Sequence, residues 1–317
     1  MKALHIFKST KDGVENGLVL LTQMLSVLRF KENHPNINFE LYTDSNTLEH
    51  YREFGIDKLY DAINTDILDT YPTNRISPHF WASPKLWVMH HMTEPFCVMD
   101  TDLVYHKTID KFYDYDYVYL HQESPINYGM PHKFESTNGF EFLDSELIAF
   151  SNVFPVNCAF MVHNNMEFLK KYTTRYFELV LDNDVKLIMD SYDARYVHKY
   201  APQIIAEQWL LPMIADHVRM YEGMYINAKS MIDTIAFPNM FRPFQLDAYP
   251  DDILDILSDN IYHLWGAKTY YETGQYDDYE RVKEDLHSAV TDAIEHNSLY
   301  HYKYVMDNIL KSMPVVS

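Results

Sequence analysis

The fold of this chain is indicated most clearly by one stretch, Pro95-Phe96-Cys97-Val98-Met99-Asp100-Thr101-Asp102. Its first part is apolar without alternation, which is typical of a strand that is buried on both faces of a sheet. The stretch then ends in two carboxylates at positions i and i+2. In an extended backbone, this spacing puts Asp100 and Asp102 on one face, where both can bind the same cation. Because open α/β sheets bind ligands at the carboxyl ends of their strands, the stretch predicts a metal site at the end of a buried strand.

A simpler interpretation is a polar turn that closes a core strand, with Asp100 and Asp102 bound to backbone amides. For an isolated Asp-x-Asp this interpretation is the default. Here apolar chain continues on the other side of the pair, in Leu103-Val104-Tyr105, which favours the metal site. Hard oxygen ligands suit Mg²⁺ or Mn²⁺, whose remaining coordination positions can be filled by phosphate oxygens and water.

Strand-like and helix-like segments alternate through the first half of the chain. The expected strands cover residues 4–7, 39–43, 58–62, 95–99, 118–120 and 159–162, and the expected helices cover residues 18–30, 46–54 and 84–92. This order predicts βαβ units, and hence an α/β fold with a mainly parallel central sheet that is flanked by helices.

The second half is more helical. Long helices are expected over residues 165–181, 203–217 and 277–311, the last one broken near Asn297-Ser298. There is no internal repeat and no long linker, which predicts a single domain over residues 1–317.

The composition argues against several classes of protein. The net charge is −20, and such a surface repels nucleic acid and anionic lipid, which bind clustered Lys and Arg. No run of about 18 apolar residues and no signal peptide is found, so we expect a cytoplasmic protein without a membrane span. Cys97 and Cys158 lie in apolar contexts, which predicts two buried free cysteines and excludes a zinc ribbon.

The stretch from Ser83 to Lys107 resembles the sugar-binding D-x-D region of GT-A glycosyltransferases, particularly those of families 8 and 32. The corresponding pieces are a basic residue on a helix, an apolar strand, the two aspartates and a following basic residue: Lys85, 96–99, Asp100-Thr101-Asp102 and His106-Lys107. The sequence departs from family 32 at Met92-Thr93-Glu94-Pro95, where that family usually has a Gly-Gly pair.

This resemblance implies a GT-A fold with a nucleotide-binding half, residues 1–120, and an acceptor-side half, residues 121–317. It further implies a nucleotide-sugar donor, with a UDP-sugar expected, and a divalent cation, Mn²⁺ or Mg²⁺. By similarity, His263 would be the third metal ligand and Lys268 would contact the diphosphate, and imidazole would favour Mn²⁺. The alternative for His263 is a packed core histidine in the aromatic segment 261–268.

Residues before the strand are candidates for the nucleotide site. Ser83 can cap a helix that Pro84 begins, and Lys85 then lies in the first turn beside free amide groups that suit a diphosphate. A surface lysine is an equally good interpretation on this motif alone. Lys8, after the first strand, and Asp44, after the second, would border the nucleotide by their positions in a GT-A fold.

Later residues are candidates for the donor sugar and the reaction. Asn157 matches an asparagine that binds donor-sugar hydroxyls in similar enzymes, and its alternative is a turn residue before a strand. Glu207 and Gln208 match an acidic residue and a glutamine that lie near the anomeric carbon. A solvated helical glutamate is equally compatible with Glu207.

The resulting prediction is a metal-dependent glycosyltransferase that moves a sugar to a hydroxyl of a carbohydrate or another acceptor. Families 8 and 32 retain the anomeric configuration, so retention is expected, and Glu207 would be the general base if the enzyme inverted. A non-catalytic carbohydrate- or nucleotide-binding protein of the same fold stays open as an alternative. A sugar nucleotidyltransferase is disfavoured, because it needs a glycine-rich loop where this chain has Lys8-Ser9-Thr10-Lys11.

Overall fold

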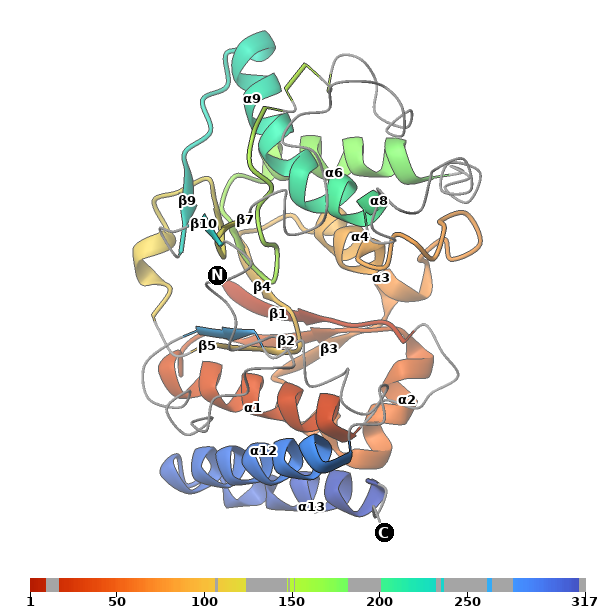
Figure 1. The fold of residues 1–317 in the computed structure, drawn as a ribbon, viewed down its shortest axis with the longest axis vertical. Helices are drawn as coiled ribbons and strands as arrows, with labels where there is room; N and C mark the ends of the chain where they lie inside the picture. The colour runs from red at the N-terminus through yellow and green to blue at the C-terminus, as the bar shows by residue number, and fades with distance from the viewer. Residues whose placement is uncertain are drawn as a thin grey trace. The chain divides into compact units, whose positions relative to one another are not determined.

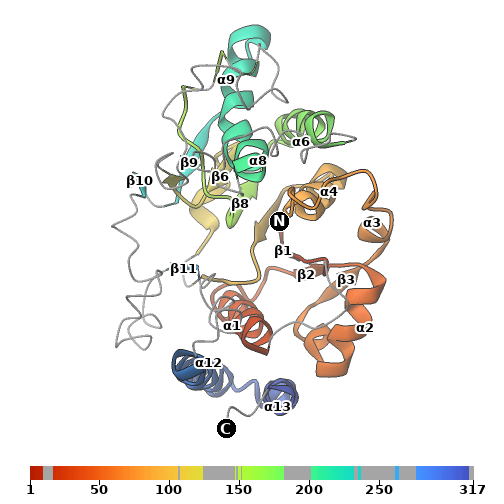
Figure 2. The ribbon, with the colours of Figure 1, turned by 45° about the vertical axis from the view of Figure 1, so that its right-hand side comes forward.

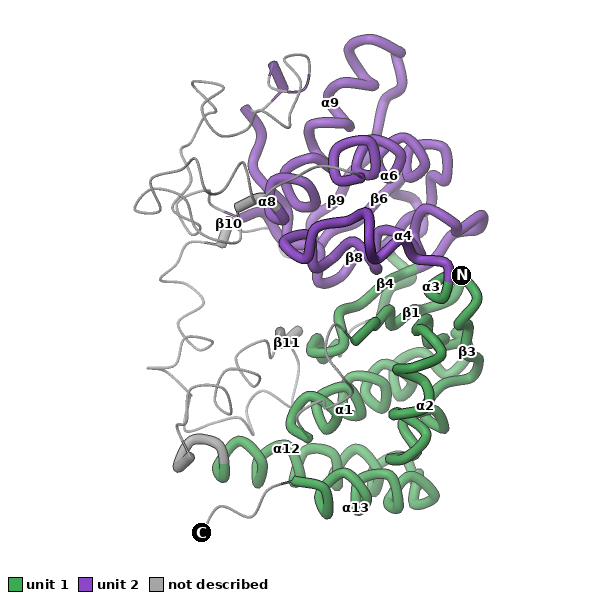
Figure 3. Tube along the Cα trace, turned by 90° about the vertical axis from the view of Figure 1, so that its right-hand side faces the viewer, with its two compact units in different colours: residues 1–69, 97–111, 242–317 green, residues 70–96, 112–241 purple. Residues whose placement is uncertain are grey.

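The structure is a computed structural model that describes residues 1–9, 17–105, 108–123, 147, 149–150, 152–181, 201–231, 235–236, 261–263 and 276–313. The chain divides into two compact units (Figure 3). Unit 1 contains residues 1–69, 97–111 and 242–317, and unit 2 contains residues 70–96 and 112–241. Because the chain passes between the units after residues 69, 96, 111 and 241, neither unit coincides with the halves expected from the sequence.

The central sheet has seven strands in the order β3-β2-β1-β4-β8-β6-β9. In unit 1, β1 (Lys2–Ile6) is parallel to β2 (Phe39–Tyr42), and β2 is parallel to β3 (Ala62–Asn64). In unit 2, β6 (Tyr117–Tyr119) is antiparallel to β8 (Phe160–His163) and parallel to β9 (Ala228–Ser230). β4 (Phe96–Met99) is buried along its whole length. The predicted α/β class, with a mainly parallel sheet flanked by helices, is confirmed.

The helices of unit 1 come from both ends of the chain. They are α1 (Gly17–Asn33), α2 (Ser45–Phe54), α3 (Asp66–Asp69), α12 (Tyr276–His296) and α13 (Lys303–Ser312). Figures 1 and 2 show α12 and α13 side by side against α1, where Arg29 binds Asp292 at 2.6 Å. The expected break of the last helix is confirmed, since Ser298 has a left-handed backbone with φ of 55°. The short η6 (Tyr300–Tyr302) follows it.

The helices of unit 2 are α4 (Ser83–His91), α6 (Met166–Val180), α8 (Ala201–Ile204) and α9 (Leu210–Glu222). Asn165 caps α6 by accepting a hydrogen bond from Phe168 N at 2.9 Å. Between α8 and α9 lies a π-helical turn, η4 (Ile205–Trp209). The continuous helix expected over residues 203–217 therefore contains an interruption.

The strand expected over residues 58–62 is wrong in its position. Gly55, with φ of 80°, ends α2 in a left-handed conformation and begins the 3₁₀ turn η1 (Ile56–Leu59). β3 starts only at Ala62, after Asp61 N has bound Phe39 O at 2.9 Å. A glycine C-cap thus shifts the strand by several residues.

Several short elements carry too little sequence pattern to be predicted. They are β5 (Leu103–Tyr105) with its antiparallel partner β11 (Ile261–His263), β7 (Gln122–Glu123) with its parallel partner β10 (Ile235–Ala236), and η2 (Asp110–Phe112). Cys97 and Cys158 are buried and free, as predicted. No helix in the described part of the chain is long and apolar enough to cross a bilayer.

One core residue makes the stability of the protein dependent on pH. His163 in β8 is fully buried, and neither ring nitrogen has a hydrogen-bond partner among the described residues. Burial lowers its pKa from 6.5 to about 3. The unfolded chain therefore binds a proton first as the pH falls below 6.5, so stability is present above that pH and is lost on acidification toward 3.

We expect His163→Leu to reduce this acid sensitivity. Below pH 6.5, protonation of His163 in the unfolded chain lowers the unfolding free energy by about 1.4 kcal/mol per pH unit. The fall in unfolding free energy between pH 7 and pH 5 should therefore be smaller by about 2 kcal/mol in the variant. Urea denaturation at the two pH values measures the difference. Replacement of the exposed His301 by Gln is the control, and it should keep the wild-type dependence. An unchanged dependence in His163→Leu would contradict the prediction.

Candidate functional site

The two aspartates lie in a turn that follows β4. Leu103 N donates to Asp100 O at 3.0 Å and closes this turn over residues 100–103. Asp102 is 4% exposed and Thr101 is also buried, whereas Asp100 is half-buried. The expected extended backbone is therefore wrong. The chain turns because the next residues leave β4 and pair, as β5, with β11. The pair still lies within four residues, so two carboxylates belong to one tight turn.

Because β5 pairs with β11, the backbone of His263, the predicted third ligand, lies close to the turn. His263 lies opposite Leu103, the residue that follows Asp102. Lys268, His106 and Lys107 lie outside the described residues. Among the side chains that the structure describes, no three His, Cys, Asp or Glu residues form a group that could hold a metal. The structure thus brings Asp102 near the backbone of His263 and leaves the ligand set a proposal.

Lys8 and Asp44 meet beyond the ends of the parallel strands β1 and β2. Lys8 Nζ donates to Asp44 Oδ2, and Asp44 Oδ1 accepts from Thr47 N at 3.0 Å as the N-cap of α2. Burial alone would raise the pKa of Asp44, but the hydrogen bonds from Lys8 and Thr47 lower it below its ordinary value. Two residues that were predicted to border the nucleotide therefore form one ion pair in unit 1.

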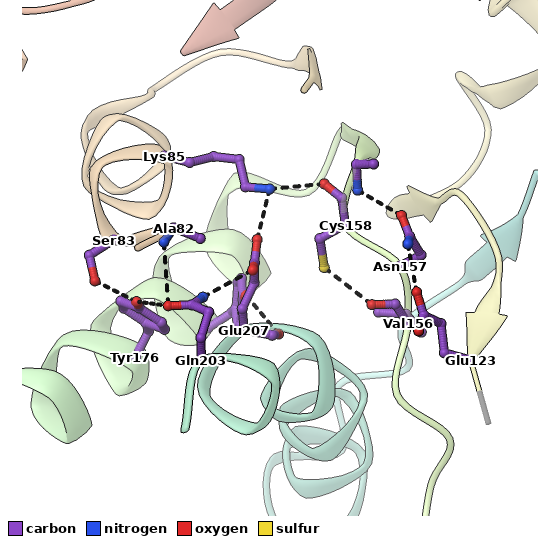
Figure 4. A network of polar contacts seen from close by, with 12 residues as sticks. Ala82, Ser83, Lys85, Glu123, Val156, Asn157, Cys158, Tyr176, Gln203 and Glu207 are labelled. Carbon is purple, nitrogen blue, oxygen red and sulfur yellow. Dashed lines mark hydrogen bonds and ion pairs between the residues drawn. The ribbon is translucent and has the colours of Figure 1, made fainter. Parts of the chain in front are cut away.

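In unit 2, a buried ion pair joins α4 to the π-helical turn η4. Lys85 Nζ lies 2.8 Å from Glu207 Oε1 and 3.1 Å from Cys158 O (Figure 4). Glu207 is 4% exposed, and its Oε2 accepts from Gln203 Nε2 at 3.0 Å. The ammonium group of Lys85 is thus bound to protein oxygens in the first turn of α4, where the sequence predicted it.

Ser83 does not cap α4. It is the first residue of the helix, Ala82 occupies the cap position, and Pro84 is the second helical residue. The Ser83 hydroxyl instead lies 2.6 Å from the Tyr176 hydroxyl, on the neighbouring helix α6 (Figure 4). Because Ala82 is the N-cap and no side-chain cap hydrogen bond is present there, the predicted cap is wrong.

Pro212 explains why the backbone widens at Glu207. A proline has no N–H, so the carbonyl four residues earlier in the helix loses its usual donor. That carbonyl belongs to Gln208, and it accepts instead from Val156 N at 2.9 Å. Leu210 N binds Ile205 O, five residues back, which is the spacing of a π-helix. Turns of this type are frequent at functional sites.

Asn157 is buried in the segment that leads to β8. Its Oδ1 accepts from Ala159 N at 3.0 Å, which is the turn geometry of the simpler interpretation. Its Nδ2 donates to Glu123 Oε1 at 2.6 Å (Figure 4). His121 Nε2 lies 3.6 Å from the same oxygen. No motif in the sequence indicated Glu123 or His121. Both strands in that region are too short to show a pattern.

Gln208 follows Glu207 in η4 and is half-buried. Its side-chain Oε1 is buried and has no hydrogen-bond partner in the part of the chain that the structure describes. A buried amide oxygen without a donor costs free energy, which makes it a candidate for a ligand contact. Gln203 was also missed by the sequence analysis. Its position four residues before Glu207 is the only local signal that could have indicated it.

A family model described as "Family of unknown function (DUF6734)" matches residues 9–246. No curated protein matches the sequence. Among solved structures, the chain is similar to the galactosyltransferase LgtC in complex with donor and acceptor sugar analogs, with 12% identity and a TM-score of 0.42 over 91% of this chain and 96% of that one. It is also similar to mouse xyloside xylosyltransferase 1, with 13% identity and a TM-score of 0.38 over 83% and 96%. These TM-scores lie below 0.5.

The buried pair of Lys85 and Glu207 leads to a test of stability. We expect Lys85→Met to lower the unfolding free energy by about 3 to 5 kcal/mol, because it leaves the Glu207 carboxylate buried without its cation. The double variant Lys85→Met/Glu207→Met should lose less than Lys85→Met alone. Urea denaturation at pH 7 measures both.

The control for this test is the exposed pair of Lys171 and Glu222, at 2.6 Å. Lys171→Met should cost less than about 1 kcal/mol, since exposed ion pairs stabilise little. A double variant that is less stable than Lys85→Met would contradict the expectation.

Proposed function

We propose that this chain, which belongs to the DUF6734 family of unknown function, is a metal-dependent glycosyltransferase. It would transfer a sugar from a nucleotide-diphosphate sugar, with a UDP-sugar expected, to an acceptor hydroxyl. The observation that carries the proposal is the turn after β4, in which a fully buried strand ends in two carboxylates. The motif resembles the D-x-D region of GT-A glycosyltransferases.

The donor set in unit 1 fits a hard divalent cation. Asp100 and Asp102 supply carboxylate oxygens from a single turn, and Mn²⁺ or Mg²⁺ prefers such ligands. The strand register puts His263 opposite Leu103, which supports His263 as the third ligand. An imidazole ligand would favour Mn²⁺. When bound, the cation would offset negative charge on the departing nucleoside diphosphate.

The protein's own cations would share this charge. We assign Lys8 and Lys268 to the diphosphate, and we assign Asp44 to the orientation of Lys8, because the two side chains are hydrogen-bonded. Thr101 lies between the two proposed ligands in sequence and is buried, and we assign it to the support of the turn. The sequence analysis expected Lys85 and Ser83 to contact the diphosphate, and we now assign them another role. Their side chains bind Glu207 and Tyr176, so we assign them to the position of α4 and Glu207.

Unit 2 supplies polar groups for a sugar. The Glu207 carboxylate is held by Lys85 and Gln203, so its orientation is fixed before any ligand arrives. The buried Oε1 of Gln208 can accept from a hydroxyl, and the Asn157 amide lies in the segment that also binds Lys85. We propose that Glu207, Gln208 and Asn157 bind donor-sugar hydroxyls near the reacting carbon.

Replacement of the two aspartates tests the proposal directly. We expect Asp100→Asn/Asp102→Asn to weaken Mn²⁺ binding at least roughly 100-fold, since loss of ligands should exceed the effect of residues behind them. Metal-dependent hydrolysis of the donor should disappear with it. Electron paramagnetic resonance titration measures free Mn²⁺, and a panel of nucleotide sugars identifies the donor.

Asp114→Asn is the matched control for charge, because Asp114 is exposed and lies outside the turn. It should leave the Mn²⁺ affinity within about twofold, because it supplies no ligand to the turn and an exposed charge is screened by salt. If the double aspartate variant binds Mn²⁺ as the wild type does, the proposed metal site is wrong.

The stereochemistry of the product gives a separate test. We expect the sugar first released from an α-linked donor to be the α anomer, as in a retaining enzyme. Proton NMR recorded before mutarotation distinguishes the two anomers. A β product would instead require a general base opposite the leaving group, and Glu207 would be the first carboxylate to replace.

A further inference from the structure

A continuous chain of buried hydrogen bonds runs through unit 1 and ends at the turn that carries the two aspartates. Tyr51 Oη lies 2.9 Å from Gln23 Oε1, and Gln23 Nε2 lies 2.6 Å from Tyr60 Oη. Tyr60 Oη lies 2.8 Å from His5 Nδ1. His5 Nε2 lies 3.1 Å from Ser26 Oγ, and Ser26 Oγ lies 2.5 Å from Leu103 O. All five of the side chains are buried.

The last link fixes the direction of every other one. A backbone carbonyl can only accept, so the Ser26 hydroxyl must donate to Leu103 O. Ser26 Oγ must then accept from His5 Nε2, which therefore carries a proton, and in a neutral imidazole Nδ1 then carries none. His5 Nδ1 accepts from the Tyr60 hydroxyl, and Tyr60 Oη accepts from the amide nitrogen of Gln23. The Gln23 oxygen accepts from Tyr51.

The charge state of His5 agrees with this direction. Burial lowers the pKa of His5 to about 3, and the Asp102 charge opposes that shift only in part. The imidazole is therefore neutral at pH 7, as the chain of donors requires. Each hydrogen in the chain points along it toward Leu103, and aligned hydrogen bonds of this kind polarise and strengthen one another.

Leu103 belongs both to the turn and to the chain of hydrogen bonds. Its N–H closes the turn by donating to Asp100 O, and its C=O receives the hydrogen bond from Ser26. Because Asp102 lies between the bonded residues Asp100 and Leu103, a shift of Leu103 would change the shape of the turn that carries both carboxylates. A contact that holds the Leu103 carbonyl thus acts on the geometry of both carboxylates without touching either of them.

We propose that Ser26 and His5 are positioning residues for the metal site, holding the turn over residues 100–103 in its cation-binding geometry through the Leu103 carbonyl. The inference rests on the proposed function, because it assigns a role toward the cation that Asp100 and Asp102 would bind. A purely structural role is the competing explanation, since any buried polar network contributes to stability. The two explanations differ in what they predict for metal affinity at constant fold.

The experiment compares two hydroxyl deletions in α1. Ser26→Ala should lower Mn²⁺ affinity roughly 10-fold, which is typical of a residue that orients metal ligands. Thr22→Ala is the matched control. Thr22 is buried one turn earlier, and its hydroxyl donates to Leu18 O at 2.8 Å, outside the chain of hydrogen bonds. It should destabilise the protein but leave the Mn²⁺ dissociation constant within about twofold, since within the described part of the chain its hydroxyl bonds to its own helix.

Both variants are titrated with Mn²⁺ well below their melting temperatures, with Asp102→Asn beside them. A dissociation constant for Ser26→Ala that equals that of Thr22→Ala would overturn the inference, whatever the stabilities. If Asp102→Asn alone binds Mn²⁺ weakly, the proposed function survives and only the positioning role fails. If Asp102→Asn also binds as the wild type does, both are wrong.

Two further measurements keep the inference testable if Ser26→Ala does not fold. Ser26→Cys keeps a small side chain with a weak donor, and a several-fold loss of Mn²⁺ affinity is expected for it, whereas an unchanged affinity would count against the positioning role. Nitrogen-15 NMR of the wild type at pH 7 reports the tautomer of His5. A proton on Nε2 is expected, and a proton on Nδ1 would overturn the hydrogen-bond directions.

Discussion

The proposed metal site in unit 1 lies in a turn that one backbone hydrogen bond closes, from Leu103 N to Asp100 O. It reverses the chain directly after β4, so a strand that is buried on all its residues ends in polar groups within a single turn. The same turn sends β5 out of the main sheet and into its pairing with β11. If the chain had stayed extended, Leu103 could not have met His263, and Asp102 would have followed the strand.

Both units contain polar side chains in an apolar interior. These side chains find their hydrogen-bond and ion-pair partners in different ways in the two units. In unit 2 the network is charged, because Lys85 offsets the buried carboxylate of Glu207. In unit 1 it is neutral and passes through Tyr60, His5 and Ser26. A buried polar group without a partner costs about 1 to 3 kcal/mol, so such networks persist only when almost every member is paired. Paired in this way, they hold their end groups in a single orientation.

The sequence predicted the fold better than the site. Apolar periodicity is a local property, so β1, β2, β4 and the long helices could be read from it. The partners of individual side chains are not local. Lys85 has the same sequence context whether it binds phosphate or Glu207. Its partner Glu207 lies more than 100 positions later in the sequence, in the π-helical turn η4. His5 and Ser26 lay inside apolar segments, where a single polar residue gives no indication of a chain of hydrogen bonds.

The contrast between the two networks has a physical reason if Asp100 and Asp102 bind a cation. A lysine that neutralised Asp102 would compete with the metal for the same oxygens, because each carboxylate has a limited number of lone pairs. A neutral chain that ends on the Leu103 carbonyl fixes the turn without adding positive charge beside the ligands. Glu207 has the opposite requirement, since removing Lys85 would leave its buried carboxylate without a paired cation. The charge of each network therefore matches the ligand proposed for it.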